Sequence, residues 1–368
     1  MSTSETSPSR SGSASREQKR LVPNPFLHVD SNRIYNPLTD RTLTAADPAW
    51  AELRSFLDSS SQIPADPSLE SDGWIVAEGD LSRQHRLKVV SLETMTACNQ
   101  KCYFCPVSLQ PREDATMAAE LFTRIVAELG RYRSTLEGVF LQSYNEPTLD
   151  RRFVEHCRAL FEAKLPVAVL SNGSGFTPAK VDALLEDGPL RYLCINLSTL
   201  DRERYRQERG EDHLNGVLRN LDYMKNRAVA EEMRIVVLGK GDDDHDRDFA
   251  AIRERFAGSR FAVDRHLVMD RAGWLDVGLR PPQPHVRLAG CDNLGSRPLQ
   301  HLHITPTGKC VLCCEDYDEN YVVGDLTSAT ISEVLAGDDL SRMRRWTYGI
   351  EEAPDDFICR NCVFARTR

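Results

Sequence analysis

From Leu87 to about residue 270, short apolar segments alternate with longer segments of helical periodicity. The apolar segments are LKVVSLE, GVFLQS, PVAVLS, RYLCINLS, MRIVVLG and RFAVDRHLVM, and each predicts a strand. Helices are expected near residues 117–130, 151–163, 178–186, up to 226, and 246–256. Strands that alternate with helices form parallel β/α units. Six strands predict an α/β fold with a partial (β/α)6 barrel, whose site lies at the carboxyl ends of the strands.

The segments that flank this region divide the 368 residues into four parts. Residues 1–20 are rich in Ser and lack an apolar core, which predicts a disordered tail and not a secretory signal. Residues 21–86 predict a strand pair, a helix, a second short helix and a strand, a small α+β module of winged-helix proportions. We assign the barrel to residues 87–285 and a C-terminal domain to residues 286–368.

The composition excludes some classes of partner. Hydrophobic residues make up 41% and charged residues 27% of the chain, as in an ordinary globular protein. No apolar run is long enough to span a membrane, so we expect a cytoplasmic protein without a membrane partner. The net charge of −9 argues against general binding to the phosphates of nucleic acid.

Eleven cysteines in such a chain indicate metal binding more than disulfides. Cys98, Cys102 and Cys105 follow the first barrel strand at C-x3-C-x2-C spacing. A [4Fe–4S] cluster normally takes four thiolates, so three close thiolates leave one iron open to a small molecule. The alternative is a zinc site that a distant ligand completes.

These cysteines resemble the signature of the radical S-adenosylmethionine (SAM) superfamily, in which an aromatic residue, here Phe104, precedes the third cysteine. Three further segments extend the resemblance: SYNEP after the second strand, LSNGSGF after the third and INLSTLDRERYRQERG after the fourth. SYNEP resembles the Gly-Gly-Glu-Pro-like segment of the family but has Asn145 where glycine is common. The resemblance covers the barrel region.

The resemblance implies a role for each matching residue. Cys98, Cys102 and Cys105 would hold a [4Fe–4S] cluster that binds SAM. The implied SAM contacts are Phe104 at the adenine, Glu146 at the methionine amino group, Asn172 in the third segment, and Ser198 and Arg209 at the ribose or carboxylate. A reductase such as flavodoxin or ferredoxin would supply an electron, SAM would be cleaved, and the 5′-deoxyadenosyl radical would take a hydrogen atom from the substrate.

The C-terminal region contains a second group of cysteines, which resembles a SPASM or shortened "twitch" iron–sulfur domain. Gly308 to Cys313 matches the Gly-x4-Cys element of such domains, Cys291 precedes it, and Cys359-x2-Cys362 follows. The resemblance implies that these four cysteines ligate an auxiliary [4Fe–4S] cluster. Cys310 and Cys314 are competing ligands, and a structural zinc ribbon is the alternative site.

Four other features have simpler interpretations. Cys157 and Cys194 are expected to be small core residues. GKGDDDHD at residues 239–246 predicts a solvated acidic loop, with a substrate contact as the alternative. His301 and His303 alternate with apolar residues, which predicts a strand with one polar face and gives no indication of ligands.

The function that follows is an oxidoreductase-type radical SAM enzyme of natural-product biosynthesis. Residues 21–86 resemble the leader-binding module of some peptide-modifying radical enzymes, which favours a ribosomally made peptide as substrate. The expected product is a cross-link, a thioether or an epimer. The first alternative is a dehydrogenase, epimerase or decarboxylase that acts on a sugar or aminocyclitol. The second is a zinc-stabilised binding protein without catalytic activity.

Overall fold

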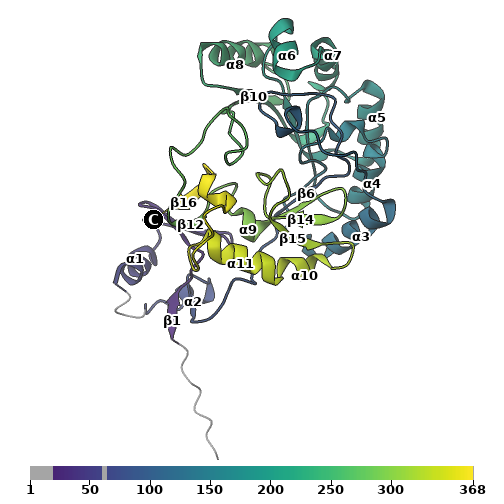
Figure 1. The fold of residues 1–368 in the computed structure, drawn as a ribbon. Coiled ribbons are helices and arrows are strands. Elements are labelled where there is room, and N and C mark those ends of the chain that lie inside the picture. The colour runs from purple at the N-terminus through teal and green to yellow at the C-terminus, as the bar shows by residue number, and fades with distance from the viewer. Residues whose placement is uncertain (1–19, 60–63, 368) are drawn as a thin grey trace, which may run out of the picture.

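The computed structural model describes residues 20–59 and 64–367 (Figure 1). Apart from Arg20, the expected tail at residues 1–20 lies outside the described residues. The centre of the fold is a sheet of nine strands in the order β11-β10-β9-β8-β7-β6-β13-β14-β15. None of the helices described is long and apolar enough to cross a membrane.

Six neighbouring strands of this sheet are parallel and follow one another in chain order. They are β6 (Val89–Leu92), β7 (Gly138–Phe140), β8 (Val167–Ser171), β9 (Leu190–Asn196), β10 (Ala230–Gly239) and β11 (Phe261–Leu267). Each coincides with one of the six apolar segments of the sequence, although β9 begins one residue and β10 three residues before its segment. The predicted α/β fold with a partial (β/α)6 barrel is therefore confirmed.

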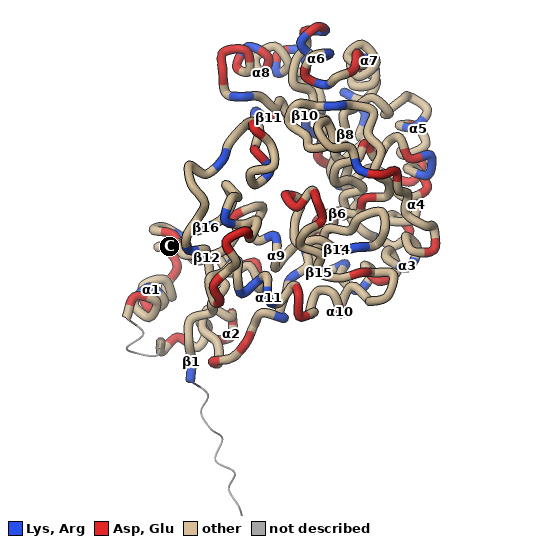
Figure 2. Tube along the Cα trace, in the orientation of Figure 1, with Lys and Arg blue, Asp and Glu red and all other residues tan. Residues whose placement is uncertain are grey.

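Helices between these strands cover the outer side of the barrel (Figure 1). They are α3 (Ala119–Leu129), α4 (Phe153–Glu162), α5 (Pro178–Asp187), α6 (Arg202–Arg209), α7 (Leu214–Met224) and α8 (Asp243–Arg255). Helix α4 shows the pattern, because Phe153, Cys157 and Leu160 recur at helical spacing and are all buried. Cys194 on β9 is buried as well, so both isolated cysteines are core residues. Lys and Arg alternate with Asp and Glu along the outer helices (Figure 2).

The first residues of α8 belong to the acidic segment at residues 239–246. Asp242 accepts a hydrogen bond from the backbone of His245 and thereby caps the helix. Asp242, Asp243 and Asp244 are exposed, as a solvated segment requires. His245 is instead buried beneath Gly239.

The C-terminal region extends the barrel sheet on its β6 side. Strand β13 (His301–Ile304) pairs in parallel with β6, and β14 (Lys309–Val311) and β15 (Val322–Asp325) continue the sheet antiparallel. The prediction of a strand at His301–Ile304 is correct, but all four of its residues are buried. His301 and His303 lie on one face of this strand, as predicted, but that face is buried.

The rest of the C-terminal region surrounds this sheet extension. It comprises β12 (Leu288–Cys291), α9 (Arg297–Gln300), α10 (Ile331–Leu335), α11 (Asp338–Thr347), the short 3-10 helix Ile358–Asn361 and β16 (Ala365–Thr367). Strands β12 and β16 pair antiparallel, which joins the beginning of the region to its end. Cys291 is thereby held near the segment that contains Cys359 and Cys362.

The N-terminal module has its own sheet and its own apolar core. Strands β2 (His28–Val29), β3 (Arg33–Asn36) and β4 (Arg41–Thr44) form an antiparallel sheet. The other elements are the pair β1 (Leu21–Pro23) and β5 (Ile75–Ala77), and the helices α1 (Trp50–Ser59) and α2 (Ser68–Ser71). Ile34, Leu53, Phe56 and Trp74 form the centre of the core.

A buried polar network attaches this module to the C-terminal region. The hydroxyl of Tyr348 lies 2.9 Å from Nε2 of His28 and donates to Ser296 at 2.7 Å. Gln300 donates to the hydroxyl of Tyr35 at 2.7 Å. Phe26 packs edge-on against Tyr348 with ring centroids 4.8 Å apart. The module is therefore fixed to the region around Cys291.

Candidate functional site

The loop with the first three cysteines begins just after β6, at the carboxyl end of the barrel. Backbone hydrogen bonds attach it to the end of α6, from Lys101 to Arg209 at 2.8 Å and from Tyr103 to Glu208 at 3.0 Å. Helix α6 begins with an Asp201 cap and ends at Gly210, whose φ of 71° is the left-handed conformation that glycine favours. This end of the helix therefore positions the cysteine loop.

Burial makes the thiols of this loop reluctant to ionise on their own. Burial, with smaller contributions from the nearby Glu146, Cys102 and Cys105, raises the pKa of Cys98 to about 12. Burial also raises the pKa of Cys105 to about 11. A coordinating metal removes the proton from such a thiol and supplies the missing positive charge. The donor chemistry of the loop therefore fits an iron–sulfur cluster.

Arg209 brings three of the predicted site residues together. Its guanidinium group, only 1% exposed, donates to Ser198 and Asn196 at 2.8 Å each. The same group lies 4.9 Å from the centre of the Phe104 ring, and Nη1 is 3.7 Å from the sulfur of Cys102. A fixed positive charge thus lies beside the cysteine loop, where it could bind a carboxylate.

Glu146 lies at the carboxyl end of β7 and is 2% exposed. Its carboxylate accepts hydrogen bonds from Ser171 and from the backbone of Asn172, each at 2.7 Å, and from the backbone of Thr148 at 3.1 Å. Burial raises its pKa above the usual range, against these hydrogen bonds. The backbone of Glu146 donates to Ala97, next to Cys98, at 3.0 Å. The carboxylate is therefore held rigidly beside the cysteine loop.

Two amides complete this side of the site. The side chain of Asn172 donates to Asn99 on the cysteine loop at 2.8 Å. Asn145 replaces the glycine expected in its segment, and its Oδ1 accepts a hydrogen bond from the backbone of Ser143 at 3.0 Å. Its buried Nδ2 has no hydrogen-bond partner among the described residues. This amide is a donor available to a bound ligand.

The four cysteines predicted for the second cluster line one cavity in the C-terminal region. They are Cys291, Cys313, Cys359 and Cys362, and Arg297 and Glu315 lie in the same wall. Cys310 is buried in the main hydrophobic core. Cys314 does not line the cavity, and its sulfur lies 3.6 Å from a carboxylate oxygen of Glu315. Four thiols around one cavity match the donor set of a fully ligated [4Fe–4S] cluster.

Burial raises the pKa of all four thiols, and that of Cys359 to about 12. Within residues 20–59 and 64–367, no three His, Cys, Asp or Glu side chains converge in metal-binding geometry. The fit of the second site therefore rests on its donor chemistry and on the shared cavity.

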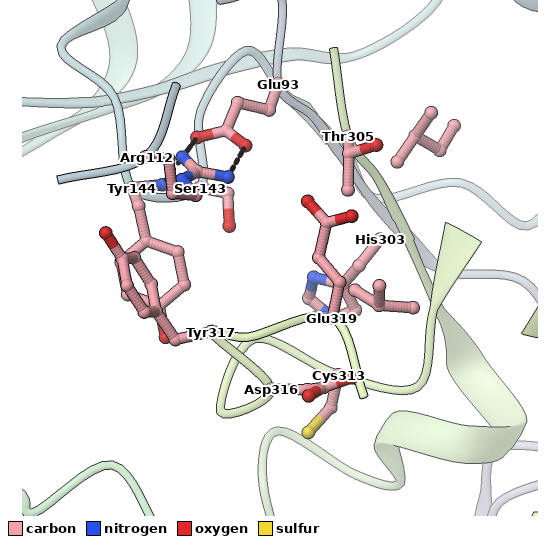
Figure 3. Close-up of a pocket in the computed structure, with 12 residues that line it drawn as sticks. Glu93, Arg112, Ser143, Tyr144, His303, Thr305, Cys313, Asp316, Tyr317 and Glu319 are labelled. Carbon is pink, nitrogen blue, oxygen red and sulfur yellow. Dashed lines mark hydrogen bonds and ion pairs between the residues drawn. The ribbon is translucent and has the colours of Figure 1, made fainter. Parts of the chain in front are cut away.

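A third space lies between the carboxyl ends of β6 and β7 and the loop after Cys313; we call it the chamber (Figure 3). Glu93 follows β6 directly and binds Arg112 through two ion-pair contacts of 2.5 and 2.8 Å. Tyr144 and Tyr317 form an aromatic wall, with ring centroids 4.8 Å apart.

The sequence motifs did not indicate the chamber. Glu93 could have been found, because it is a lone carboxylate at the end of an apolar strand on the functional side of the barrel. Arg112 and Tyr317 belong to irregular loops that give no pattern of their own. The chamber shares Arg112, Tyr317 and Glu319 with a wider groove on the surface, which gives it a route to solvent.

Comparison with known proteins defines the class. The model of the radical SAM superfamily matches residues 92–252, and that of the SPASM iron–sulfur cluster-binding domain matches residues 291–363. The chain therefore contains a radical SAM domain followed by a SPASM domain, as the sequence motifs predict. These two matches contain the two cysteine sets. They support SAM, a SAM-binding [4Fe–4S] cluster and an auxiliary iron–sulfur cluster as the cofactors, in place of zinc.

Individual relatives are more distant. The probable GTP 3′,8-cyclase of Pyrococcus abyssi is 28% identical over 169 residues, which are 45% of this chain and 51% of the relative. The chain thus spans about half the length of the curated relatives it matches. SuiB of Streptococcus suis bound to precursor peptide SuiA has a TM-score of 0.57 at 12% identity and covers 93% of both chains. BtrN in complex with AdoMet and 2-DOIA has a TM-score of 0.50 at 17% identity, over 72% of this chain and 87% of BtrN. At these identities the two structures show the fold alone.

Proposed function

We propose that this protein is a radical SAM enzyme that modifies a ribosomally made peptide by abstracting a hydrogen atom from it. The observation that carries the proposal is the N-terminal module with its sheet edge. Among the strands that the structure describes, β4 pairs with β3 alone, and Arg41, Thr42 and Thr44 on it are exposed. An extended peptide can add to such an edge as a further strand. The similarity to SuiB, solved with a precursor peptide, extends over this module as well.

The residues of the first site have separate tasks in this proposal. A reduced [4Fe–4S] cluster with bound SAM supplies a 5′-deoxyadenosyl radical able to abstract hydrogen from an unactivated carbon. Cys98, Cys102 and Cys105 would hold that cluster. Arg209 and Ser198 would bind the carboxylate or ribose of SAM beside the Phe104 ring, and Glu146 would bind its ammonium group. A reductase such as flavodoxin or ferredoxin is the expected electron donor.

The chamber would hold the reacting part of the substrate away from water. It lies between the SYNEP segment that contains Glu146 and the loop that begins at Cys313. Its connection to the surface groove would let one segment of a peptide enter while the rest stays outside. The four thiols around the second cavity would ligate a cluster fully, which suits an electron acceptor better than a substrate-binding metal.

One observation favours a second candidate, an enzyme for a sugar-like or aminocyclitol-like molecule. Several charged side chains line the chamber, and they suit a polar small molecule. The similarity to BtrN, which was solved with 2-DOIA, covers 72% of this chain. This candidate leaves the exposed edge of β4 without a role.

Photochemical cross-linking tests the peptide proposal without removing the module. A photoreactive amino acid replaces Thr42 on β4 or, as a control, Glu155 on the outer side of α4; both positions are exposed. The probes are the peptides encoded by short reading frames beside the gene. We expect cross-links to one of these peptides from position 42 and not from position 155, and a mass change of that peptide upon reaction with SAM and reductant. Equal labelling at both positions, without a mass change, would refute the proposal.

A further inference from the structure

Two buried hydrogen-bond donors of the chamber have no partner. Nε of Arg112 and Nδ1 of His303 are both inaccessible to solvent, and neither forms a hydrogen bond among the described residues. Arg112 lies with Glu93 on one wall, and His303 lies across the chamber beside Glu319 (Figure 3). His303 is only 2% exposed. A buried polar group without a partner is costly, so two in one chamber indicate a missing ligand.

The neighbours of His303 determine which of its nitrogens carries the proton. Nη1 of Arg297 lies 3.4 Å from Nε2 of His303 and 3.0 Å from Nδ1 of His301. A guanidinium group only donates, so each of these two ring nitrogens must be the acceptor. Burial, with Arg297 adding to it, lowers the pKa of His303 well below its usual range, so the ring is neutral. The proton of His303 therefore resides on Nδ1.

The tautomer of His301 follows from the same argument. Its Nδ1 accepts from Arg297, so its Nε2 carries the proton and donates to the backbone oxygen of Leu294 at 3.1 Å. Arg297 is itself held by Asn293, whose side-chain oxygen accepts from Nη2 at 3.0 Å. Arg297 thus has a fixed position between the two histidines.

We propose that Nδ1–H of His303 and Nε–H of Arg112 bind oxygen atoms of the substrate in the chamber, with Arg297 as the positioning residue that sets the His303 tautomer. The ligand chemistry is that of an acceptor oxygen, from an amide carbonyl or a carboxylate. The Tyr144 and Tyr317 rings beside Arg112 would pack against the neighbouring carbon atoms. This inference takes one point from the proposed function, namely that the substrate binds in this chamber.

The first test measures the tautomer directly. Protein with both clusters reconstituted, in the oxidised state, is labelled with ¹⁵N-histidine, and long-range ¹H–¹⁵N correlations report which ring nitrogen is protonated. The His303 signal is the one that disappears in His303→Asn, or in His303→Gln if the first variant does not fold. We expect a neutral ring protonated on Nδ1, and in Arg297→Met a mixture of tautomers. A ring protonated on Nε2, or on both nitrogens, would overturn the proposal.

The second test adds small probes to the same sample. N-methylacetamide represents a peptide carbonyl and acetate represents a carboxylate. We expect one of them to shift the Nδ1 signal of His303, and the larger response identifies the source of the oxygen. His301, whose two ring nitrogens are both engaged, is the internal control and should not respond. No shift with either probe, or equal shifts at both histidines, would overturn the proposal. Formation of 5′-deoxyadenosine is measured separately. Failure of the proposed function is therefore distinguishable from failure of the inference about His303 and Arg112.

Discussion

Arg209 is the residue on which the first site most depends. It is buried, it binds Ser198 and Asn196, and its guanidinium group lies over Phe104. Replacing it with Met would leave the oxygens of Ser198 and Asn196 without their donor and remove the charge that would bind SAM. A hydrogen bond to a charged group contributes about 1.5–3 kcal/mol. We therefore predict that Arg209→Met weakens SAM binding about tenfold to a hundredfold.

The matched control for this prediction is on the same helix. Arg206 forms an exposed ion pair with Glu203 at 2.7 Å, and such surface pairs contribute little. Arg206→Met should leave the dissociation constant of SAM, measured by anaerobic calorimetry on reconstituted protein, unchanged. Equal affinities in wild type and Arg209→Met would show that Arg209 only supports the cysteine loop.

The cysteines of the C-terminal region give a second prediction at this scale. The Cys359→Ala/Cys362→Ala variant should lose about four iron atoms per chain, one cluster, and form less product, while SAM cleavage is largely retained. Cys313→Ala should also lose about four, because Cys313 lines the cavity with the other three thiols. In Cys310→Ala and Cys314→Ala the iron content should stay at the wild-type level. Loss of iron in Cys314→Ala but not in Cys313→Ala would show that Cys314, and not Cys313, is the cluster ligand.

The candidate residues of the first site have a signal in the sequence that those of the chamber lack, for a physical reason. Phe104 follows β6, Glu146 follows β7, and Ser198 and Arg209 follow β9; parallel strands bring their carboxyl ends together at one edge of the sheet. A strand count is therefore enough to predict that they meet. His303 enters the chamber from the C-terminal region, and its tautomer depends on Arg297. No local pattern contains that information.

Among the elements, Tyr348 after α11 connects the N-terminal module to the region around Cys291. Its hydroxyl bonds His28 and Ser296 in a buried network. We predict that Tyr348→Phe lowers the free energy of unfolding by about 1–3 kcal/mol, the cost of leaving buried partners unsatisfied. Chemical denaturation measures the change.

Tyr223 on α7 is the control for this variant, because its hydroxyl bonds the exposed Asp182 at 2.8 Å. Tyr223→Phe should change the free energy of unfolding by less than about 0.5 kcal/mol, as surface substitutions usually do. Equal effects of the two variants would mean that the module is attached to the C-terminal region without this network.

The elements themselves were largely predictable, and their long-range pairing was not. The six barrel strands and α3 to α8 follow from the hydrophobic period of local segments. The pairing of β13 with β6 joins segments about two hundred residues apart in sequence, and nothing in either segment specifies the other. The C-terminal region was therefore expected as a domain of its own, whereas its strands continue the barrel sheet.

For the whole molecule, the attachment of the N-terminal module decides how its function can be tested. The module shares buried contacts with the region of Cys291 through Tyr348 and Gln300. Deleting residues 21–86 would leave these side chains exposed and unpaired, so lost turnover would not show that the module binds a peptide. Cross-linking from Thr42 keeps these contacts and is the cleaner experiment.

The central claim is that the chain holds a SAM-cleaving cluster at Cys98, Cys102 and Cys105 and a second cluster in its C-terminal region. Its most direct test is anaerobic reconstitution with iron and sulfide, followed by reduction in the presence of SAM. We predict about eight iron and eight sulfide per chain and the formation of 5′-deoxyadenosine and methionine. The Cys98→Ala/Cys102→Ala/Cys105→Ala variant should keep about four iron and form no 5′-deoxyadenosine. Zinc without sulfide in the purified protein, or no 5′-deoxyadenosine from fully reconstituted protein, would contradict the account.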